Sequence, residues 1–346
     1  MLVRGQIMAQ ASAPTEPTSL SPVPAATFSE AKPTPKDTAD DNSTLDSLLK
    51  QEGFGVVKLK QKNLDNQKAH KNYPKHLTIE KARKNAPKHL FIDVEVNRVS
   101  ASLIVDTGTP TTNIARGMLE KFGLVEQQTS YRVSSPLGSS NKFYGIAELN
   151  TLAMGNYVIQ DLPVLIETIP YVDGVFGLDD MHRIGAVLDC AGPALYYAPQ
   201  RPRSDISTEL AAMLQRNGFT QVPMRLTSDH HLEVACSIDG VPSTIMVDTG
   251  SQATCVDKSI GIKAGIITKR TRRVLIGSGG ASAPVRVGHV KQFAIGDFEI
   301  RDADINFVGL KKADPPFAHL LGIGELASNS AIIDVGGLSM YLRHPQ

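Results

Sequence analysis

The chain has 346 residues, of which 41% are hydrophobic and 21% charged, and its 36 lysines and arginines nearly cancel its 35 aspartates and glutamates. This is the composition of a folded protein of about two domains, and a net charge of +1 argues against a general polyanion binder, so we expect no nucleic-acid partner. The three cysteines cannot form a fully paired disulfide framework and match no metal-binding spacing, so no metal site is expected.

The chain begins with a segment of low sequence complexity. Residues 1–43 are rich in Pro, Ala, Ser and Thr, and such a stretch buries too little apolar surface to offset the entropy of ordering it. We expect a disordered tail or linker, whose composition slightly favours a periplasmic or secreted protein over a cytoplasmic one. The first residues lack the apolar stretch of a secretion signal, and no apolar run approaches the roughly 18–20 residues of a membrane span.

The rest of the chain is one unit used twice, at 44–200 and 201–346. Three kinds of segment recur at offsets of 142 to 145 residues: alternating apolar strands at 90–96 and 232–238, Val-Asp-Thr-Gly-Thr at 105–109 and Val-Asp-Thr-Gly-Ser at 247–251, and Val-Phe-Gly at 175–177 and Leu-Leu-Gly at 320–322. Each copy opens on a short helix and continues as short strands with Gly-rich turns. This pattern predicts an all-β fold with two similar barrel-like or sandwich-like lobes and few short helices.

The first copy carries a basic insertion between its first two strands. The offset between the copies falls from 165 residues at the opening helix to 142 at the following strand, so 23 residues are added within about 60–88. This window holds nine lysines and arginines but only Asp65 and Glu80 as acidic residues. The simple interpretation is a solvated surface excursion. The alternative is an electrostatic dock for an acidic partner or an anionic surface.

The repeated Asp-Thr-Gly motif is the chemically informative one. Asp106 and Asp248 each end an apolar strand at equivalent points of the repeat. If the two carboxyl groups face each other across a pseudo-two-fold axis, they cannot both ionise readily, and the pair holds one proton. The ionised member can activate a water while the protonated member hydrogen-bonds a substrate carbonyl. The alternatives are two ordinary Asp-Gly turns, or a phosphoaspartate site, which needs a different local pattern.

The neighbours of the two aspartates predict how the loops are supported. Glycine lets backbone N–H groups approach the carboxylates. The threonine after each aspartate can brace the two loops, and the hydroxyl three residues after each aspartate can donate to the outer carboxylate oxygen. These supporting residues are Thr107, Gly108, Thr109, Thr249, Gly250 and Ser251.

On these motifs the chain resembles the aspartic protease superfamily and, within it, retropepsin-like bacterial aspartyl proteases with two copies fused in one chain. The resemblance covers about residues 44–346 and implies that Asp106 and Asp248 are both catalytic, with no metal or organic cofactor. It also implies a monomer built as an internal pseudo-dimer, with a Gly-bearing flap over the cleft from each copy. The flap glycines would be Gly138 in the first copy and Gly277, Gly279 and Gly280 in the second.

The sequence therefore predicts an aspartic endopeptidase that hydrolyses an extended polypeptide bound between the lobes. Two alternatives remain open: a peptide-binding module of the same fold that does not cut, and an envelope-associated protein that acts through the basic insertion. The repeat aligns two of the three cysteines with aliphatic residues, so Cys190, Cys236 and Cys255 are expected to be buried structural thiols. His230 and His231 precede a strand and are expected to be exposed in a turn.

Overall fold

The fold is given by a computed structural model. It describes residues 41–63, 88–132, 135, 137, 143–169, 172–198, 203–277, 282–310 and 319–345. All of them belong to one compact unit, Asp40–Gln346. The predicted tail up to residue 40, residues 64–87 of the basic insertion, and the flap glycines Gly138, Gly279 and Gly280 lie outside the described residues.

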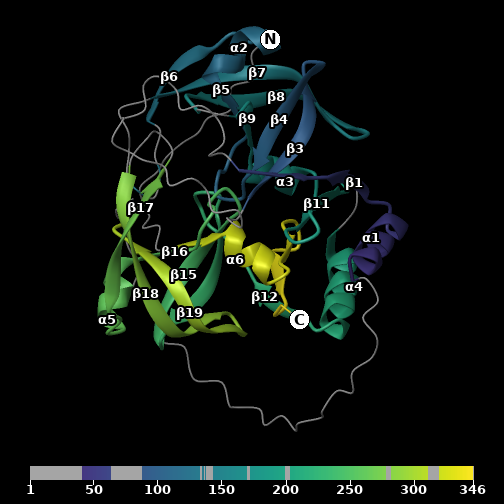
Figure 1. The fold of residues 1–346 in the computed structure, drawn as a ribbon. Helices are drawn as coiled ribbons and strands as arrows, with labels where there is room; N and C mark the ends of the chain where they lie inside the picture. Colours follow the sequence, from purple (N-terminus) through teal and green to yellow (C-terminus); the bar gives the residue numbers. More distant parts are fainter. Residues whose placement is uncertain are drawn as a thin grey trace, which may run out of the picture. The chain divides into compact units, whose positions relative to one another are not determined.

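The expected all-β architecture with few short helices is confirmed, because the described strands form three sheets (Figure 1). One eight-stranded sheet, which we call the N-terminal lobe, belongs to the first copy of the repeat. In pairing order its strands are β2 (Lys60–Lys62), β3 (His89–Val96), β4 (Val99–Val105), β9 (Gly174–Phe176), β5 (Asn113–Ala115), β8 (Tyr157–Glu167), β7 (Phe143–Met154) and β6 (Gln127–Arg132). β3 also pairs with β7, so the sheet curls back on itself.

The second eight-stranded sheet, the C-terminal lobe, repeats this order strand by strand. In pairing order its strands are β13 (Arg225–Leu226), β14 (Leu232–Ile238), β15 (Val241–Asp248), β20 (His319–Gly322), β16 (Cys255–Asp257), β19 (Phe298–Val308), β18 (Ser282–Ile295) and β17 (Thr268–Ile276). β14 also pairs with β18, as β3 does with β7. The two copies of the repeat predicted from the sequence therefore have the same sheet topology.

The alternating apolar segments became the strands that the pattern predicts. In β3 and β14 the apolar side chains at every second position are buried, and Leu90, Ile92, Leu232 and Ile238 have no exposed surface. Successive side chains of a strand point to opposite faces, so one face of each strand lines the core. Both strands contribute to one continuous hydrophobic core that extends through both lobes.

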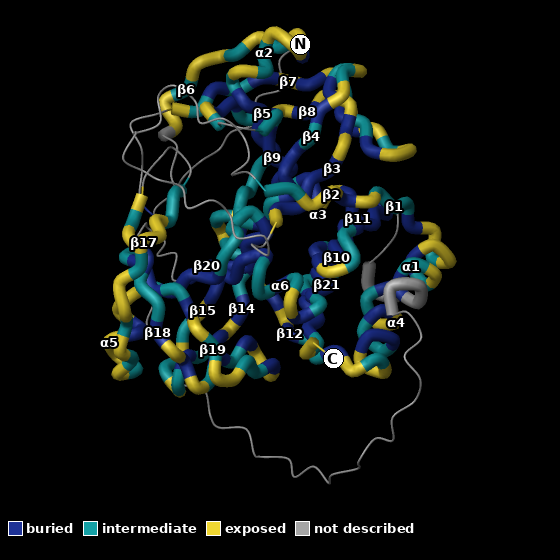
Figure 2. The backbone as a smooth tube through the Cα atoms, in the orientation of Figure 1, coloured by how far each residue is buried: buried dark blue, intermediate teal, exposed yellow. Residues whose placement is uncertain are grey.

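The third sheet joins the two copies. Its strands, in pairing order, are β1 (Gly55–Lys58), β11 (Ala194–Tyr197), β10 (Val187–Asp189), β21 (Ile332–Asp334), β22 (Ser339–Leu342) and β12 (Thr220–Pro223). The copies meet where β10 pairs antiparallel with β21, with Leu188 opposite Ile333. Both strands are completely buried (Figure 2). The two copies are thus hydrogen-bonded to each other through a shared sheet.

The described helices are short. They are α1 (Asp41–Gln51), η2 (Arg116–Met118), α2 (Leu119–Phe122), α3 (Leu178–Arg183), α4 (Arg203–Arg216), α5 (Lys258–Lys263) and α6 (Ile323–Ser328). α1 begins within the predicted tail, three residues before the expected start of the first copy. α1 and α4 pack their apolar side chains, including Leu49 and Leu210, against Tyr196 and Tyr341 of the shared sheet. No described helix is long and apolar enough to cross a membrane.

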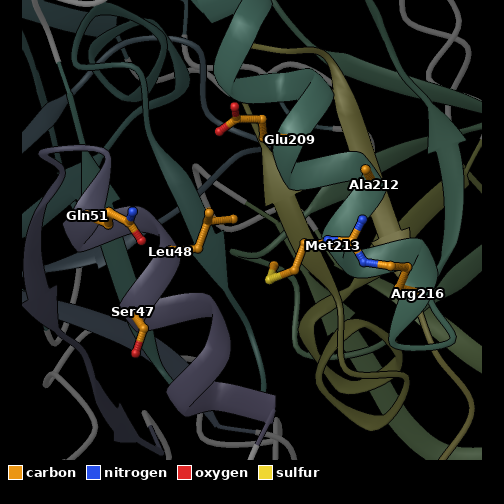
Figure 3. Close-up of a pocket in the computed structure, with 7 residues that line it drawn as sticks. All are labelled: Ser47, Leu48, Gln51, Glu209, Ala212, Met213 and Arg216. Atoms are coloured by element: carbon orange, nitrogen blue, oxygen red, sulfur yellow. The ribbon is translucent and has the colours of Figure 1, made fainter.

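A surface hollow of about 550 Å³ lies between α1 and α4 (Figure 3). Its lining residues are Ser47, Leu48, Gln51, Glu209, Ala212, Met213 and Arg216. All of them come from the two helices, and neither Asp106 nor Asp248 is among them. The chemistry predicted from the Asp-Thr-Gly motifs therefore belongs to another part of the molecule, at the ends of β4 and β15.

Candidate active site

Each Asp-Thr-Gly motif lies at the end of a strand that pairs in parallel with a second buried strand. β4 pairs in parallel with β9, with Val105 opposite Phe176, and the N–H of Asp106 donates to the carbonyl of Phe176 at 3.1 Å. In the second copy β15 pairs in parallel with β20, which places Asp248 opposite Gly322. The Val-Phe-Gly and Leu-Leu-Gly segments therefore lie behind the two aspartate loops.

The two loops are tied together by their threonines. The hydroxyl of Thr107 donates to the carbonyl of Val247 at 2.7 Å, and the hydroxyl of Thr249 donates to the carbonyl of Val105 at 2.8 Å. Each hydroxyl oxygen also accepts from the backbone N–H of the opposite threonine, at 3.0 and 3.1 Å. Both threonines are fully buried, so these four reciprocal bonds fix one loop relative to the other.

The glycines bring each loop against the opposite carboxyl group. A Cβ atom built on Gly108 would lie 2.5 Å from Oδ1 of Asp248, and one built on Gly250 would overlap the carboxyl group of Asp106. Only glycine allows this approach, since any larger residue would displace the carboxyl group it faces. The two predicted catalytic aspartates are thus brought together, each against the backbone of the other lobe.

Hydrogen bonds orient the two carboxyl groups differently. Asp106 accepts from the N–H of Gly108 at 2.8 Å and from the hydroxyl of Thr109 at 2.7 Å, as the sequence predicts. Asp248 accepts from the N–H of Ser251 at 2.9 Å. The expected bond from the Ser251 hydroxyl to Asp248 is wrong, because that hydroxyl donates to the carbonyl of Ala253 at 3.0 Å. The turn after Asp248 offers a carbonyl that a short serine side chain reaches locally.

The electrostatics of the pair favour one shared proton. Asp248 is only 9% exposed, and burial raises its pKa well above the ordinary carboxyl value. The negative charge of Asp106 and a carboxyl–carboxyl hydrogen bond raise the pKa of Asp248 further, while the N–H groups of Ser251 and Gly250 oppose the rise. Asp106 is half-buried. Burial and like charge together therefore favour the protonated form of Asp248 beside a more accessible Asp106.

Two histidines outside the Asp-Thr-Gly motifs, His89 and His231, lie beside the loops. The buried His89 forms a hydrogen bond from its Nε2 to the carbonyl of Gly250, at 3.1 Å, and so links the N-terminal lobe to the Asp-Thr-Gly loop of the other copy. His231 occupies the same position in the second copy, 142 residues later, and is also buried. This shared offset was the signal that could have identified them.

The expected exposure of the two neighbouring histidines holds for one of them. His230 is exposed, with its Nδ1 2.7 Å from Oδ1 of Asp179. The expectation is wrong for His231, because Thr227 pairs with its backbone and the turn directs its side chain inward. Burial lowers the pKa of His231, while the nearby charges of Asp229 and Asp106 oppose that change.

The cysteines are buried and unpaired, as expected. Burial raises the pKa of Cys236 and of Cys255 to about 12, so neither thiol is ionised at neutral pH. The part of the chain that the structure describes contains no group of three or more His, Cys, Asp or Glu side chains able to hold a metal ion.

One of the four predicted flap glycines is described. Gly277 directly follows β17, and a Cβ built on it would lie 2.6 Å from Oγ of Ser135 and 3.5 Å from Cδ1 of Leu137. Ser135 and Leu137 lie within three residues of Gly138, the predicted flap glycine of the first copy, and we call residues 134–140 the flap segment of that copy. The described parts of the two segments are therefore in contact.

Comparisons with known proteins agree with the motifs. Residues 92–183 match the family model of the gag-polyprotein putative aspartyl protease, and residues 234–323 match a second model, Aspartyl protease. No curated protein matches the chain. The chain belongs to the aspartyl proteases and contains two retropepsin-like domains.

Two solved structures are similar to the chain at low sequence identity. A retropepsin-like aspartic protease from Rickettsia conorii is 16% identical, with a TM-score of 0.28 over 42% of this chain and 89% of that one. An aspartic proteinase from Irpex lacteus is 13% identical, with a TM-score of 0.46 over 85% of this chain and 98% of that one.

Proposed function

We propose that the chain is a monomeric aspartic endopeptidase in which Asp106 and Asp248, one from each lobe, act on a single water. The observation that carries the proposal is the crossed contact of the loops, in which Gly108 lies against Asp248 and Gly250 against Asp106. The arrangement supplies two carboxyl groups close enough to share a proton. Family membership supports a polypeptide as the substrate.

The reaction follows from the unequal environments of the two carboxyl groups. Asp106, as the ionised member, accepts a proton from the water, whose oxygen attacks the carbonyl carbon of the scissile bond. Asp248, as the protonated member, gives its proton to the carbonyl oxygen, and a gem-diol forms. Asp106 then passes its proton to the amide nitrogen, the C–N bond breaks, and a gem-diol hydroxyl returns a proton to Asp248. Both carboxyl groups end in their starting states.

We further propose that each copy, 44–200 and 201–346, provides one lobe of this internal dimer. A second chain is then unnecessary, since both aspartates and all four threonine bonds come from one chain. Turnover should then scale linearly with protein concentration, and the active species should sediment as a monomer.

The decisive experiment measures cleavage of an unstructured protein between pH 3 and pH 8. Asp106→Asn and Asp248→Asn should each lower turnover by about 10²–10⁴-fold, because asparagine keeps the shape but cannot exchange the proton. Asp297→Asn, at an exposed turn, is the matched control and should cleave like the wild type. Near-normal turnover by either dyad variant would refute the assignment. A wild type that binds the substrate without cutting it would instead be a peptide-binding module.

A further inference from the structure

Strand β17 carries a dense positive charge that no described acidic residue neutralises. Its sequence from 268 is Thr-Lys-Arg-Thr-Arg-Arg-Val-Leu-Ile, and its cationic side chains are all exposed. They are Lys269, Arg270, Arg272 and Arg273, which we call the basic strand residues. Within the described residues, none of these four side chains forms an ion pair or hydrogen bond. Figure 2 shows the strand as largely exposed along its length.

The charge is not required by the fold. The equivalent strand of the N-terminal lobe, β6, reads Gln-Gln-Thr-Ser-Tyr-Arg and carries a single cation. Both strands lie at the outer end of their sheet and both contain a bulge. In the bulge of β6 the hydroxyl of Thr129 donates to the carbonyl of Tyr144, and in that of β17 the hydroxyl of Thr271 donates to the carbonyl of Val285. Charged residues often protect an edge strand from aggregation. Because β6 is the corresponding edge strand and has only one cation, edge protection does not explain the four cations of β17.

The charge also has a local cost. Arg270 lies directly opposite Arg286 of β18 in the ladder. The guanidinium of Arg286 is held there by the hydroxyl and carbonyl of Thr268, at 2.7 and 2.6 Å. Like charges directly opposite each other destabilise a sheet. A bound anionic group would offset this repulsion.

The strand lies next to the site. β17 leads directly into Gly277, which contacts Ser135 of the opposite flap segment. Arg273 and Asp248 both act on the buried thiol of Cys255. Burial is the main reason its pKa is high, the charge of Asp248 adds to the rise and that of Arg273 opposes it. Arg273 therefore lies within electrostatic range of a residue beside the catalytic loop.

The backbone of β17 is suited to an extended partner. The strand pairs with β18 along one edge, and no other described strand pairs with its second edge. An extended peptide can add to such an edge through main-chain hydrogen bonds, while its side chains meet those of the strand.

We propose that β17 is a docking strand for an acidic stretch of the polypeptide substrate, so that peptides with Asp and Glu residues near the scissile bond are preferred. This inference rests on the proposed function, since it concerns the substrate of the same site. The asymmetry between β17 and β6 places the acidic preference on the side of the bond that contacts the C-terminal lobe. On the N-terminal side the exposed Tyr131 stands at the position of Arg273 and offers an aromatic contact.

The test measures binding of two fluorescent peptides to the full chain carrying Asp106→Asn, which prevents cleavage. The peptides are identical except that one contains four Glu residues where the other contains Gln. At low salt the acidic peptide should bind at least about tenfold more tightly, and 1 M salt, where the Debye length is about 3 Å, should remove the preference. Changing all four basic strand residues to Gln should also remove it.

A matched variant controls for net charge. Changing Arg98, Lys258, Lys263 and Lys291 to Gln removes the same four charges from other exposed positions, and should leave the preference intact. Arg272→Glu with Arg273→Glu, a second route should the fourfold variant unfold, brings the net charge of the strand to zero and should also remove the preference. The proposal would be overturned by any of three results: the wild-type strand binds both peptides equally, the preference for the acidic peptide survives in the β17 variants, or the control variant loses the preference to the same extent.

Cleavage of both peptides by the wild type separates this inference from the proposed function. Cleavage of both peptides at equal efficiency, together with equal binding, refutes the docking strand and leaves the protease intact. Selective binding of the acidic peptide without cleavage of either refutes the protease and leaves β17 as an acidic-peptide binding strand.

Discussion

At the scale of single residues, the site depends on contacts that each copy makes with the other. Gly108 and Gly250 face the opposite carboxyl group, and Thr107 and Thr249 exchange hydrogen bonds across the lobes. The sequence predicts these roles because the motif occurs twice and each residue type has one evident use. His89 escaped prediction, since its role depends on a contact with Gly250, which lies 161 residues away in the sequence.

His89 is expected to position the loop that carries Asp248. His89→Phe removes the donor to the Gly250 carbonyl and should lower kcat by about 10- to 100-fold, as expected for loss of a hydrogen bond worth roughly 1–3 kcal/mol. KM should change less, because the histidine is buried and bonded to the loop. His89→Gln keeps an amide donor and should recover part of kcat. The exposed His230→Phe is the control, and a kcat unaffected by His89→Phe would contradict the prediction.

The raised pKa of Asp248 predicts how stability depends on pH. Below the ordinary carboxyl pKa of about 3.9, Asp248 is protonated in both the folded and the unfolded chain, and the stability associated with its raised pKa is fully present. As pH rises from there towards the folded pKa, only the unfolded chain loses the proton, and this stability is lost.

Asp248→Asn cannot ionise, so it should be more stable than the wild type at pH 7 and similar to it at pH 3. The measurement is thermal unfolding of both proteins across this range, with Asp297→Asn as the exposed control. A difference between the two proteins that is the same at both pH values would contradict the raised pKa of Asp248.

At the scale of elements, the alternation of apolar and polar residues decides which strands can be predicted from the sequence. β3 and β14 show a clear period of two because one face is buried and the other is not. β10 and β21 are three residues long and buried on both sides, so they carry no period. Val-Leu-Asp at 187–189 and Ile-Ile-Asp at 332–334 recur at the same offset of 145 residues as Val-Phe-Gly and Leu-Leu-Gly, but only the structure shows that they pair with each other.

The shared sheet predicts that the lobes unfold together. Leu188→Ala, at the fully buried centre of the β10–β21 pair, should lower the free energy of unfolding by about 2–5 kcal/mol. Val158→Ala, at a half-exposed position of β8, should change it little. Because the chain has eight tyrosines and no tryptophan, tyrosine fluorescence and far-ultraviolet circular dichroism are the two probes. Their transitions should coincide for both variants, and two separate transitions would show that the lobes fold independently.

At the scale of the whole molecule, the repeat gives two lobes of one topology that differ in what they add to it. The first copy adds the basic insertion, and the second carries the basic strand β17. Symmetry made the shared topology and the aspartate pair predictable. The differences could not be interpreted in the same way, because a charged segment in a sequence does not reveal whether it faces solvent, a partner or the site.

The basic insertion leads to the last prediction. In the C-terminal lobe a short turn joins β13 to β14, closed by the N–H of Thr227 donating to the carbonyl of His231 at 2.9 Å. In the N-terminal lobe β2 ends at Lys62 and β3 begins at His89, and these two residues lie opposite each other as Thr227 and His231 do. The same turn can therefore join β2 to β3. Replacing residues 63–88 by Ser-Asp-His, copied from residues 228–230, should give a folded protein of nearly unchanged stability. The entropy cost of closing a loop grows only slowly with its length, so shortening the loop should change the free energy of unfolding little.

The deletion distinguishes the two interpretations of the insertion. If its lysines only form a solvated surface, the shortened protein should cleave neutral and acidic peptides as the wild type does. If they form a dock, cleavage of an acidic substrate should fall selectively, and the wild-type preference for it should fade as salt rises. Combining the deletion with the β17 variant separates the contributions of the two basic segments, since independent sites have additive effects on binding free energy. An insoluble or unfolded deletion protein would show that the insertion covers part of the core or a strand edge.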